Sequence, residues 1–239
     1  MYAPPPPAEK ERAVQRMFSS IARFYDLNNT LLSFGLHHRW KVRTIELAAL
    51  RPGEAVADIG AGTADLSILA AGAVGSEGKV VALDLNEPML RLGQKKLSGR
   101  RIGQALCALG NAERLPLADQ SVDAVLTGFC MRNVTDLDQA LREIYRILKP
   151  GGRMACLEFS RPPGSALRKL YDFYSFTLLP KIGTWVSKDP TGVYSYLPDS
   201  IRKFPDQEGL KKRMENAGFA RVTYENLTGG IVAIHVGRK

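Results

Sequence analysis

The sequence predicts an α/β fold with a seven-stranded, mostly parallel sheet that ends in an antiparallel hairpin. Two observations support this prediction. Five short apolar runs between residues 55 and 159 alternate with helical segments, which is typical of βαβ units with helices on both faces of a parallel sheet. The last two β-rich runs are separated by only five residues, whereas parallel neighbours need a crossover of a dozen or more. These two strands must therefore pair antiparallel.

The predicted elements follow one another with clear turn signals between them. Strands are expected at residues 55–59, 80–85, 104–108, 122–127, 154–159, 219–225 and 231–236. Helices are expected at residues 65–73, 86–97 and 136–148, with Asn86 as the N-cap of the second and a Lys-Pro-Gly-Gly turn after the third. Upstream, apolar residues recur at helical spacing from Val14 to Tyr25, which predicts one amphipathic helix, and another helix is expected around Trp40.

The length of 239 residues, at 26.3 kDa, fits one domain with a modest cap. We expect residues 1–50 to form an N-terminal helical cap and residues 51–239 to form the main domain. An insertion of about residues 161–206, rich in Pro, Gly and Tyr, interrupts the alternation after the fifth strand, on the substrate side. It is too long for a structureless loop, and functional lids are a common reason for such segments.

Composition excludes several classes of protein. No apolar run approaches the ~20 residues of a membrane span, and the N-terminus lacks the apolar core of a secretory signal. Cys107, Cys130 and Cys156 lie in apolar runs without C-x-x-C spacing, and the histidines show no metal-ligand spacing. We therefore expect no metal, no disulfide framework and a reducing, cytoplasmic compartment.

The net charge of +9 is unevenly distributed along the chain. Residues 51–160 hold thirteen Lys and Arg against thirteen Asp and Glu, whereas the segments on either side are basic. No stripe of cations interleaved with stacking aromatic residues is present, so no nucleic-acid partner is expected. Basic segments with aromatic residues, such as 171–176 and the segment around Trp185, indicate peripheral association with an anionic membrane surface, at its inner face. A solvated basic face without a partner explains the charge pattern equally well.

A loop with two glycines, between the first strand and the next helix, predicts a nucleotide-like ligand. Gly60 and Gly62 let the backbone turn sharply and approach a ligand. A dinucleotide fingerprint requires Gly or Ala five residues after Gly60, where this sequence has Asp65. Carboxylates near the loop, Asp58 and Asp65, favour a cationic ligand such as S-adenosylmethionine over a pyrophosphate.

Two later positions complete the predicted cofactor site. Asp84 ends the second strand and is expected to accept hydrogen bonds from ribose hydroxyls, a role that serves either kind of cofactor. Asn111 follows the third strand and is expected to meet the adenine ring, although an ordinary turn residue is an equally good interpretation.

Several stretches outside the glycine loop are more specific. They are residues 18–22 with 25–26, 32–35, 110–113 with 115–116, 132–136, 157–160, 196–201, 204–207 and 227–231. Taken together, from Met17 to Arg238, the chain resembles the ubiquinone/menaquinone biosynthesis C-methyltransferase family (UbiE/MenG-like). This sequence departs from the family pattern at Ala61 and Ala64, which replace glycines and are expected to keep negative φ angles. It departs again at Cys130, which stands in place of a glycine and is expected to reshape the substrate wall.

The resemblance implies a Rossmann-like class I methyltransferase fold and a specific reaction. The expected reaction is S-adenosylmethionine-dependent C-methylation of a polyprenylated quinol ring, either demethylmenaquinol to menaquinol or 2-methoxy-6-polyprenyl-1,4-benzoquinol, or both. The family's cofactor positions carry over to Thr63, Asp84, Asn111 and Ala112. The resemblance leaves open the head group, the length of the prenyl tail and whether the enzyme forms a homodimer.

Methyl transfer to an electron-rich ring requires positioning and a cation near the developing phenolate. Arg132 ends the fourth strand and is expected to supply that charge, unless it only pairs at the surface with Asp136 or Glu143. Asn133 is expected to orient the same hydroxyl. Glu158 is either a general base or a buried supporting carboxylate, so the identity of the base stays open.

Three weaker candidates accompany these residues. Tyr25 is expected on the substrate side, closing over the cofactor, or else in the core, and His37 and His38 are further candidate bases. Two other functions are left open. One is a methyltransferase for another phenolic or lipid acceptor. The other is a nicotinamide-dependent reductase or a non-catalytic nucleotide-binding module, which Asp65 disfavours.

Overall fold

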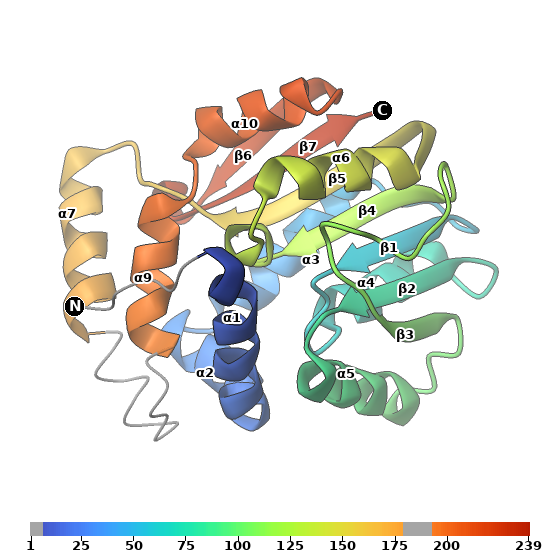
Figure 1. Ribbon diagram of the computed structural model, residues 1–239, viewed down its shortest axis with the longest axis horizontal. Helices are drawn as coiled ribbons and strands as arrows, with labels where there is room; N and C mark the ends of the chain where they lie inside the picture. Colours follow the sequence, from blue (N-terminus) through green and yellow to red (C-terminus); the bar gives the residue numbers. More distant parts are fainter. Residues whose placement is uncertain (1–6, 179–192) are drawn as a thin grey trace.

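One mixed sheet organises residues 7–178 and 193–239, the part of the chain that this computed structural model describes (Figure 1). Within these ranges its strands are β1 Ala55–Ile59, β2 Lys79–Asp84, β3 Ala105–Leu109, β4 Val122–Gly128, β5 Leu148–Phe159, β6 Ala220–Leu227 and β7 Val232–Arg238. Their order is β3-β2-β1-β4-β5-β7-β6; the first five are parallel, and β7 pairs antiparallel with both β5 and β6. The predicted fold class is confirmed.

Alternating side chains on the strands supply two apolar layers, as the pleat requires. Val56, Ala124 and Leu126 pack with the helices α3 Leu36–Ala48, α4 Asp65–Val74 and α5 Glu87–Gly99. Their neighbours Ala57 and Val125 face the other way, toward α6 Leu137–Ile147 and α10 Gln207–Asn216. Helices therefore cover both faces of the sheet, as the alternation predicted.

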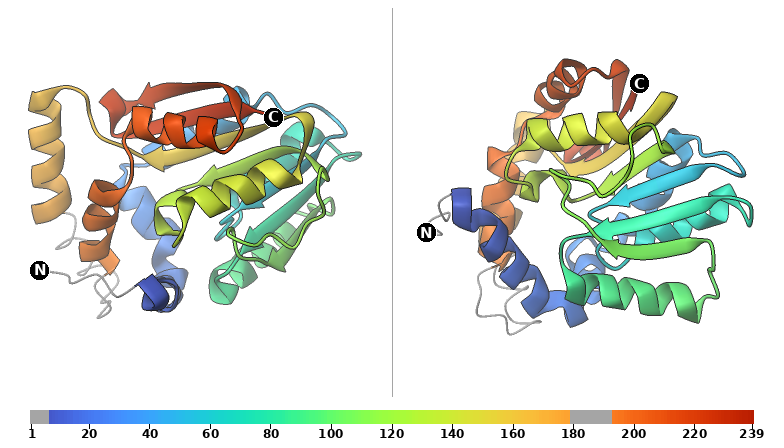
Figure 2. Two further views of the ribbon diagram at one scale, coloured as in Figure 1. Left: turned by 45° about the horizontal axis from the view of Figure 1, so that its top comes forward. Right: turned by 45° about the vertical axis from the view of Figure 1, so that its right-hand side comes forward.

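Four more helices gather at the carboxyl ends of the parallel strands (Figures 1 and 2). They are α1 Pro7–Ile21, α2 Tyr25–Leu32, α7 Ser165–Phe173 and α9 Val193–Lys203. Val14, Met17 and Ile21 of α1 form a small core with Tyr196 of α9. This end of an open α/β sheet is where ligands bind, so these helices cover the expected site.

Most of the predicted strands and helices end within two residues of the observed bounds, but two predictions differ by more. The single amphipathic helix predicted from Val14 to Tyr25 is interrupted by a short 3-10 helix, Ala22–Phe24, and α2 begins at Tyr25. β5 begins at Leu148 rather than at residue 154, because Leu148 pairs with Val122 before a bulge near the predicted turn.

Part of the predicted insertion lies outside the described residues, namely 179–192 with Trp185. In its described part, α7 continues into a π-helical turn, Tyr174–Leu178. Across the described ranges, no helix combines the length and apolar character needed to cross a bilayer.

Candidate active site

The loop that follows β1 has the tight geometry that its glycines predicted. Gly60 and Gly62 have φ angles of +71° and +54°, which favour glycine. A Cβ on Gly60 would lie 2.2 Å from Cys130 Sγ, so this backbone has no room for a side chain. Ala64 also has a positive φ, +64°, and the prediction of a negative angle there was wrong.

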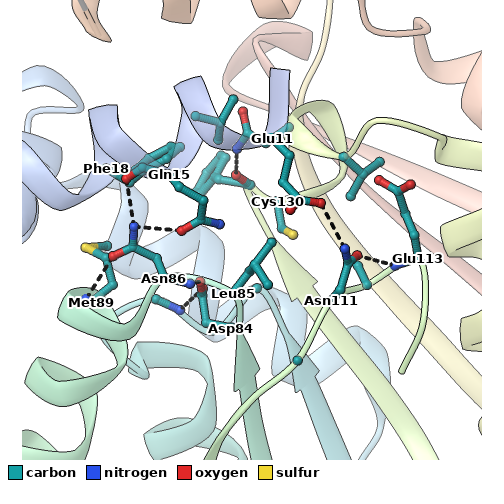
Figure 3. Close-up of a pocket in the computed structure, with 18 of the residues that line it drawn as sticks. Glu11, Gln15, Phe18, Asp84, Leu85, Asn86, Met89, Asn111, Glu113 and Cys130 are labelled. Carbon is teal, nitrogen blue, oxygen red and sulfur yellow. Dashed lines mark hydrogen bonds between the residues drawn. The ribbon is translucent and has the colours of Figure 1, made fainter. Parts of the chain in front are cut away.

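A pocket lies beside this loop, and we call it the loop pocket. Its lining includes Glu11, Gln15, Phe18, Tyr25, Gly60, Gly62, Asp84, Asn86, Met89, Asn111, Ala112, Glu113, Phe129, Cys130 and Asn133 (Figure 3). Asp84 is its organising residue: Oδ2 accepts the N–H of Gly62 and Oδ1 accepts the N–H of Asn86, both at 2.7 Å. Since each carboxylate oxygen has a second lone pair, Asp84 retains acceptor capacity toward the pocket.

Helix α1 closes the loop pocket from the side opposite the sheet. Asn86 Nδ2 donates to the main-chain oxygen of Gln15, and Asn111 Nδ2 donates to Glu11 Oε2, at 2.9 and 3.0 Å (Figure 3). Glu11 and Gln15 were not predicted as site residues. They share one helix face with Phe18, at spacings of four and three residues, and this periodicity was a signal for them.

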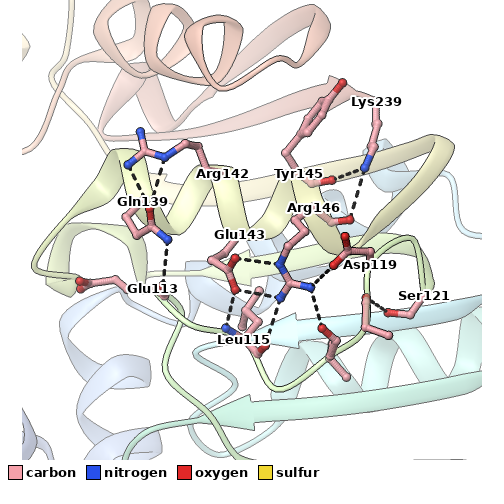
Figure 4. Close-up of polar contacts among 12 residues, drawn as sticks. Glu113, Leu115, Asp119, Ser121, Gln139, Arg142, Glu143, Tyr145, Arg146 and Lys239 are labelled. Atoms are coloured by element: carbon pink, nitrogen blue, oxygen red, sulfur yellow. Dashed lines mark hydrogen bonds and ion pairs between the residues drawn. The ribbon is translucent and has the colours of Figure 1, made fainter.

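The segment that carries Asn111 into the loop pocket is fixed from behind by α6 (Figure 4). Arg146 donates to the main-chain oxygens of Leu115 and Leu117, and the Leu115 N–H donates to Glu143 Oε2 at 2.8 Å. Glu143 also pairs with Arg146 at 2.8 Å, so the predicted alternative of an Arg132–Glu143 surface pair was wrong.

A second, apolar cavity of about 460 Å³ adjoins the loop pocket, and we call it the aromatic chamber. Trp40, Phe159, Tyr171, Tyr174 and Tyr196 are among the residues that line it. Three side chains, Phe18, Tyr25 and Phe129, line both cavities. A molecule in the chamber would therefore meet a molecule in the loop pocket across these rings.

Arg132 lies at the wall of the aromatic chamber and is almost completely buried. Its Nη1 lies 2.8 Å from Glu158 Oε1, and its guanidinium lies over the ring of Phe159, at 5.3 Å from the centroid. Although burial opposes the charge, the carboxylate of Glu158 holds the pKa of Arg132 above its usual value. Nε of Arg132 is buried and has no hydrogen-bond partner among the described residues.

Comparison with known proteins decides the family. A model of the ubiE/COQ5 methyltransferase family matches residues 7–239. The chain is 50% identical over 232 residues to the ubiquinone/menaquinone biosynthesis C-methyltransferase UbiE of Serratia proteamaculans, covering 97% of this chain and 92% of that protein. The same-named protein of Idiomarina loihiensis is 47% identical, with the same coverage. This chain belongs to the ubiE/COQ5 methyltransferase family.

Solved structures support the fold of this ubiE/COQ5 family member. A SAM-dependent methyltransferase of Thermotoga maritima, described as a possible histamine N-methyltransferase, superposes with a TM-score of 0.63 at 22% identity, covering 93% of this chain and all of that one. A SAM-dependent methyltransferase of Aquifex aeolicus gives 0.62 at 18% identity, covering 83% and 88%. At these identities the likeness concerns the fold alone.

Four of the predicted residues line neither cavity: Asp58, Thr63, Asp65 and Glu158, the last of which is paired with Arg132. Asp58 is buried below the loop and accepts from Ser67 Oγ at 2.6 Å, and burial raises its pKa to about 7. Thr63 donates to Asp26 Oδ1 at 2.7 Å. Asp65 pairs with Lys41 and Lys96, which lower its pKa to about 2 against the effect of burial. The interpretation that Asp58 and Asp65 present negative charge to the ligand does not fit these positions.

The remaining candidates lie in one or the other cavity, except His38. Asn133 lines the loop pocket, so it does not share the position of Arg132 in the chamber wall. His37 lines the chamber, with Nε2 at 3.1 Å from Thr30 Oγ1, and burial lowers its pKa to about 4. His38 is exposed. Cys130 lines the loop pocket rather than the chamber. Among the described residues, no three His, Cys, Asp or Glu side chains are grouped to hold a metal ion.

Proposed function

We propose that this protein transfers a methyl group from S-adenosylmethionine to a ring carbon of a polyprenylated quinol in quinone biosynthesis. One observation carries the proposal. A pocket at the glycine loop, whose charged side chains are acidic, and an apolar chamber share the rings of Phe18, Tyr25 and Phe129, and a buried arginine lies in the wall of the chamber. The relatives named ubiquinone/menaquinone biosynthesis C-methyltransferase, at 47–50% identity, support the same reaction.

The loop pocket suits a cationic cofactor. Among the described residues that line it, the charged ones are Glu11, Asp84 and Glu113, all of them acidic. A sulfonium with an ammonium group is attracted by such a lining, whereas the pyrophosphate of a dinucleotide is repelled. This lining favours a sulfonium methyl donor over a nicotinamide dinucleotide. The negative charge that was predicted from Asp58 and Asp65 thus comes from Glu11, Asp84 and Glu113 instead.

We assign the cofactor contacts to the residues that line the loop pocket. Asp84 accepts the ribose hydroxyls, Gly60 and Gly62 admit the ligand close to the backbone, and Asn111 and Ala112 flank the adenine ring. Thr63 and Asp58 act indirectly, because Thr63 binds Asp26 and Asp58 lies beneath the loop. S-adenosylmethionine supplies the methyl group; the residues of this chain hold the two reactants in line.

The chamber wall supplies the charge that the reaction needs. The ring carbon attacks best when the neighbouring hydroxyl has already lost its proton, and Arg132 offers a buried N–H donor that stabilises the resulting phenolate. That proton, and the proton that the ring carbon loses after methylation, pass to solvent, because no side chain is assigned as the base. Glu158 acts as a positioning residue that holds the guanidinium, rather than as the base. Tyr25 separates the two reactants, and Asn133 acts from the cofactor side. The apolar lining accommodates the ring and the start of the prenyl tail.

The proposed setting is the cytoplasmic face of a membrane. Residues 161–215 hold ten Lys and Arg against six Asp and Glu, and residues 1–50 hold seven against four. Such basic segments attract anionic lipid, where a polyprenyl quinol is dissolved. We expect vesicle binding that increases with anionic lipid and decreases with salt, whereas binding that depends on neither contradicts this setting.

The test is methyl transfer by purified protein to demethylmenaquinol and to the methoxy-benzoquinol. We expect Arg132→Ala to lower turnover about 100-fold or more while leaving the affinity for S-adenosylhomocysteine near that of the wild type. The matched control is Arg142→Ala, which removes an exposed guanidinium on α6. An equal loss of cofactor binding in Arg132→Ala contradicts the assigned role. Thermal stabilisation by NAD but not by S-adenosylhomocysteine contradicts the proposed function itself.

A further inference from the structure

Exposed apolar side chains are concentrated at the mouth of the aromatic chamber. In the described part of the chain ten large apolar residues are exposed, and six of them lie on or next to α2 and α7. Four follow one face of the α2 region, at spacings of three, four and three residues: Phe24, Leu27, Leu31 and Phe34. The other two, Leu170 and Phe173, lie on α7. We call these six residues the apolar rim.

The rim is continuous with the chamber. Phe34, Leu170 and Phe173 are 82%, 64% and 56% exposed, yet all three also line the chamber. The end of α7 lies against the end of α2, because Tyr174 Oη donates to the main-chain oxygen of Leu32 at 2.7 Å. Figure 1 shows both helices at the end of the molecule away from β1–β3. Water-exposed apolar surface of this kind marks an interaction site, and here it surrounds an opening.

The charges around the rim suit anionic headgroups. Arg23, next to α2, and Lys169, on α7, are exposed on the elements that carry the rim. The acidic side chains on these elements are paired: Asp26 with Lys96 at 2.6 Å, and Asp172 with Arg202 at 3.6 Å. An apolar stripe flanked by unneutralised cations is the pattern of a helix that lies in the interface of an anionic bilayer.

We propose that the apolar rim inserts into the headgroup region of an anionic bilayer, so that the aromatic chamber opens directly into the lipid. This inference rests on the proposed function, because only a substrate dissolved in lipid needs such an opening. It goes further than charge attraction in two ways. It assigns the membrane-docking surface to α2 and α7, and it orients the protein so that the mouth of the chamber faces the bilayer. A second copy of the chain is the other occupant that such a surface could take, and the experiment separates the two.

The decisive variant is Leu27→Ser/Leu31→Ser. Both side chains belong to the rim, at 51% and 46% exposure, and neither lines the chamber or the loop pocket. The matched control is Leu106→Ser on the edge strand β3, which is 70% exposed and also lines neither cavity. We measure co-sedimentation with vesicles of phosphatidylcholine containing 30% phosphatidylglycerol, a composition within the anionic range that basic surfaces respond to.

We expect the double variant to bind vesicles at least tenfold more weakly than the wild type, because it lacks two leucine side chains whose transfer from water into the bilayer favours binding. We expect the control variant to bind vesicles as tightly as the wild type. Methylation of a long-tailed quinol in vesicles decreases in parallel. Methylation of a short-tailed, water-soluble quinol stays within about twofold, because the cavities are intact.

Unchanged vesicle binding by the double variant overturns the inference. So does a change from dimer to monomer in sedimentation with vesicle binding unaltered, because the rim is then an interface between copies. A wild type that methylates neither the long-tailed nor the short-tailed quinol overturns the proposed function instead, whatever its vesicle binding.

Discussion

Arg132 and Glu158 form an ion pair whose side chains are only 5% and 2% exposed, with Nη1 and Oε1 2.8 Å apart. The pair is well supplied with hydrogen bonds: Glu158 also accepts the N–H of Phe159 at 2.8 Å, and Arg132 Nη1 also donates to the main-chain oxygen of Phe129. Burying two charges costs several kcal/mol each, which only such geometry offsets. The pair therefore holds a cation at the chamber wall, and the free energy lost by burying each charge is offset only while both partners are present.

The two charges should consequently be coupled in stability. We expect Arg132→Met and Glu158→Gln each to lower the free energy of unfolding by about 3–5 kcal/mol, because each leaves an unpaired group buried. The double variant should lose much less than the sum of the two. Urea unfolding of the four proteins measures this cycle. Arg91→Met, in the exposed pair with Glu87, should change stability by no more than about 1 kcal/mol. Additive losses would contradict the coupling.

The buried carboxyl of Asp58 predicts a specific pH dependence. Burial raises its pKa to about 7, whereas an unfolded aspartate titrates near pH 4. Between these values the folded protein holds a proton that the unfolded chain releases, so the stabilisation is full below about pH 4 and is lost as pH rises to 7. From pH 5 to pH 8 the wild type should lose about 2–3 kcal/mol more than Asp58→Asn, which retains the Ser67 contact. Parallel pH profiles of unfolding would exclude this assignment.

Gly93 on α5 predicts a reversal of the usual effect of replacing glycine with alanine. A Cβ there would lie 2.9 Å from the Cβ of Ala64 and 3.2 Å from the main-chain oxygen of Gly62. Such a replacement inside a helix ordinarily stabilises by about 1 kcal/mol, as we expect for Gly72→Ala on α4, where no atom lies within 4 Å. Gly93→Ala should instead destabilise the protein and weaken S-adenosylhomocysteine binding, because it displaces the glycine loop.

A second substitution checks that explanation. Adding Ala64→Gly to Gly93→Ala removes the 2.9 Å contact and should restore part of both stability and affinity. Thermal unfolding and calorimetric titration measure the two effects. If Gly93→Ala behaves like Gly72→Ala, the packing of α5 against the loop does not control the site.

Local features of the sequence were sufficient for most of the fold. β1 has its predicted bounds, and Asn86 caps α5 as predicted, with Oδ1 accepting the N–H of Met89. These features depend on neighbours in the chain, where period and capping are visible. The interruption of the helix after Ile21 could not be predicted, because the apolar period continues across the short 3-10 helix Ala22–Phe24.

The site was predictable only where single elements define it. The glycine loop and Asp84 follow directly from strand ends, and both line the loop pocket. Pairings across the chain were not predictable: Glu158 lies 26 residues from Arg132, and Glu11 lies 100 residues from Asn111. Asp65 is the converse case, since its position by the loop suggested a ligand role but tertiary packing pairs it with Lys41 and Lys96.

The side chain of Asn86 has two structural roles, and a single substitution can separate them. Its Oδ1 caps α5, while the two N–H groups of its Nδ2 are shared among three acceptors, the main-chain oxygen and Oε1 of Gln15 and Ser19 Oγ, each at 2.9 Å. Aspartate is an equally good N-cap but has no donor, so Asn86→Asp keeps the helix and releases α1. With hydrogen bonds worth about 1 kcal/mol each, tryptic cleavage in α1, after Arg12 or Arg16, should accelerate about tenfold or more.

Releasing α1 should also weaken binding of the cofactor, because Gln15 and Phe18 line the loop pocket. We expect S-adenosylhomocysteine to bind about tenfold more weakly to Asn86→Asp than to the wild type. We also expect a saturating concentration of S-adenosylhomocysteine to slow the tryptic cleavage of the wild type. The control is Asp206→Asn, which exchanges the same two residue types at the N-cap of α10 and leaves α1 untouched. Cleavage of Asn86→Asp at the wild-type rate would show that the contacts of Asn86 are not needed to hold α1, whose apolar face packs through Val14, Met17 and Ile21.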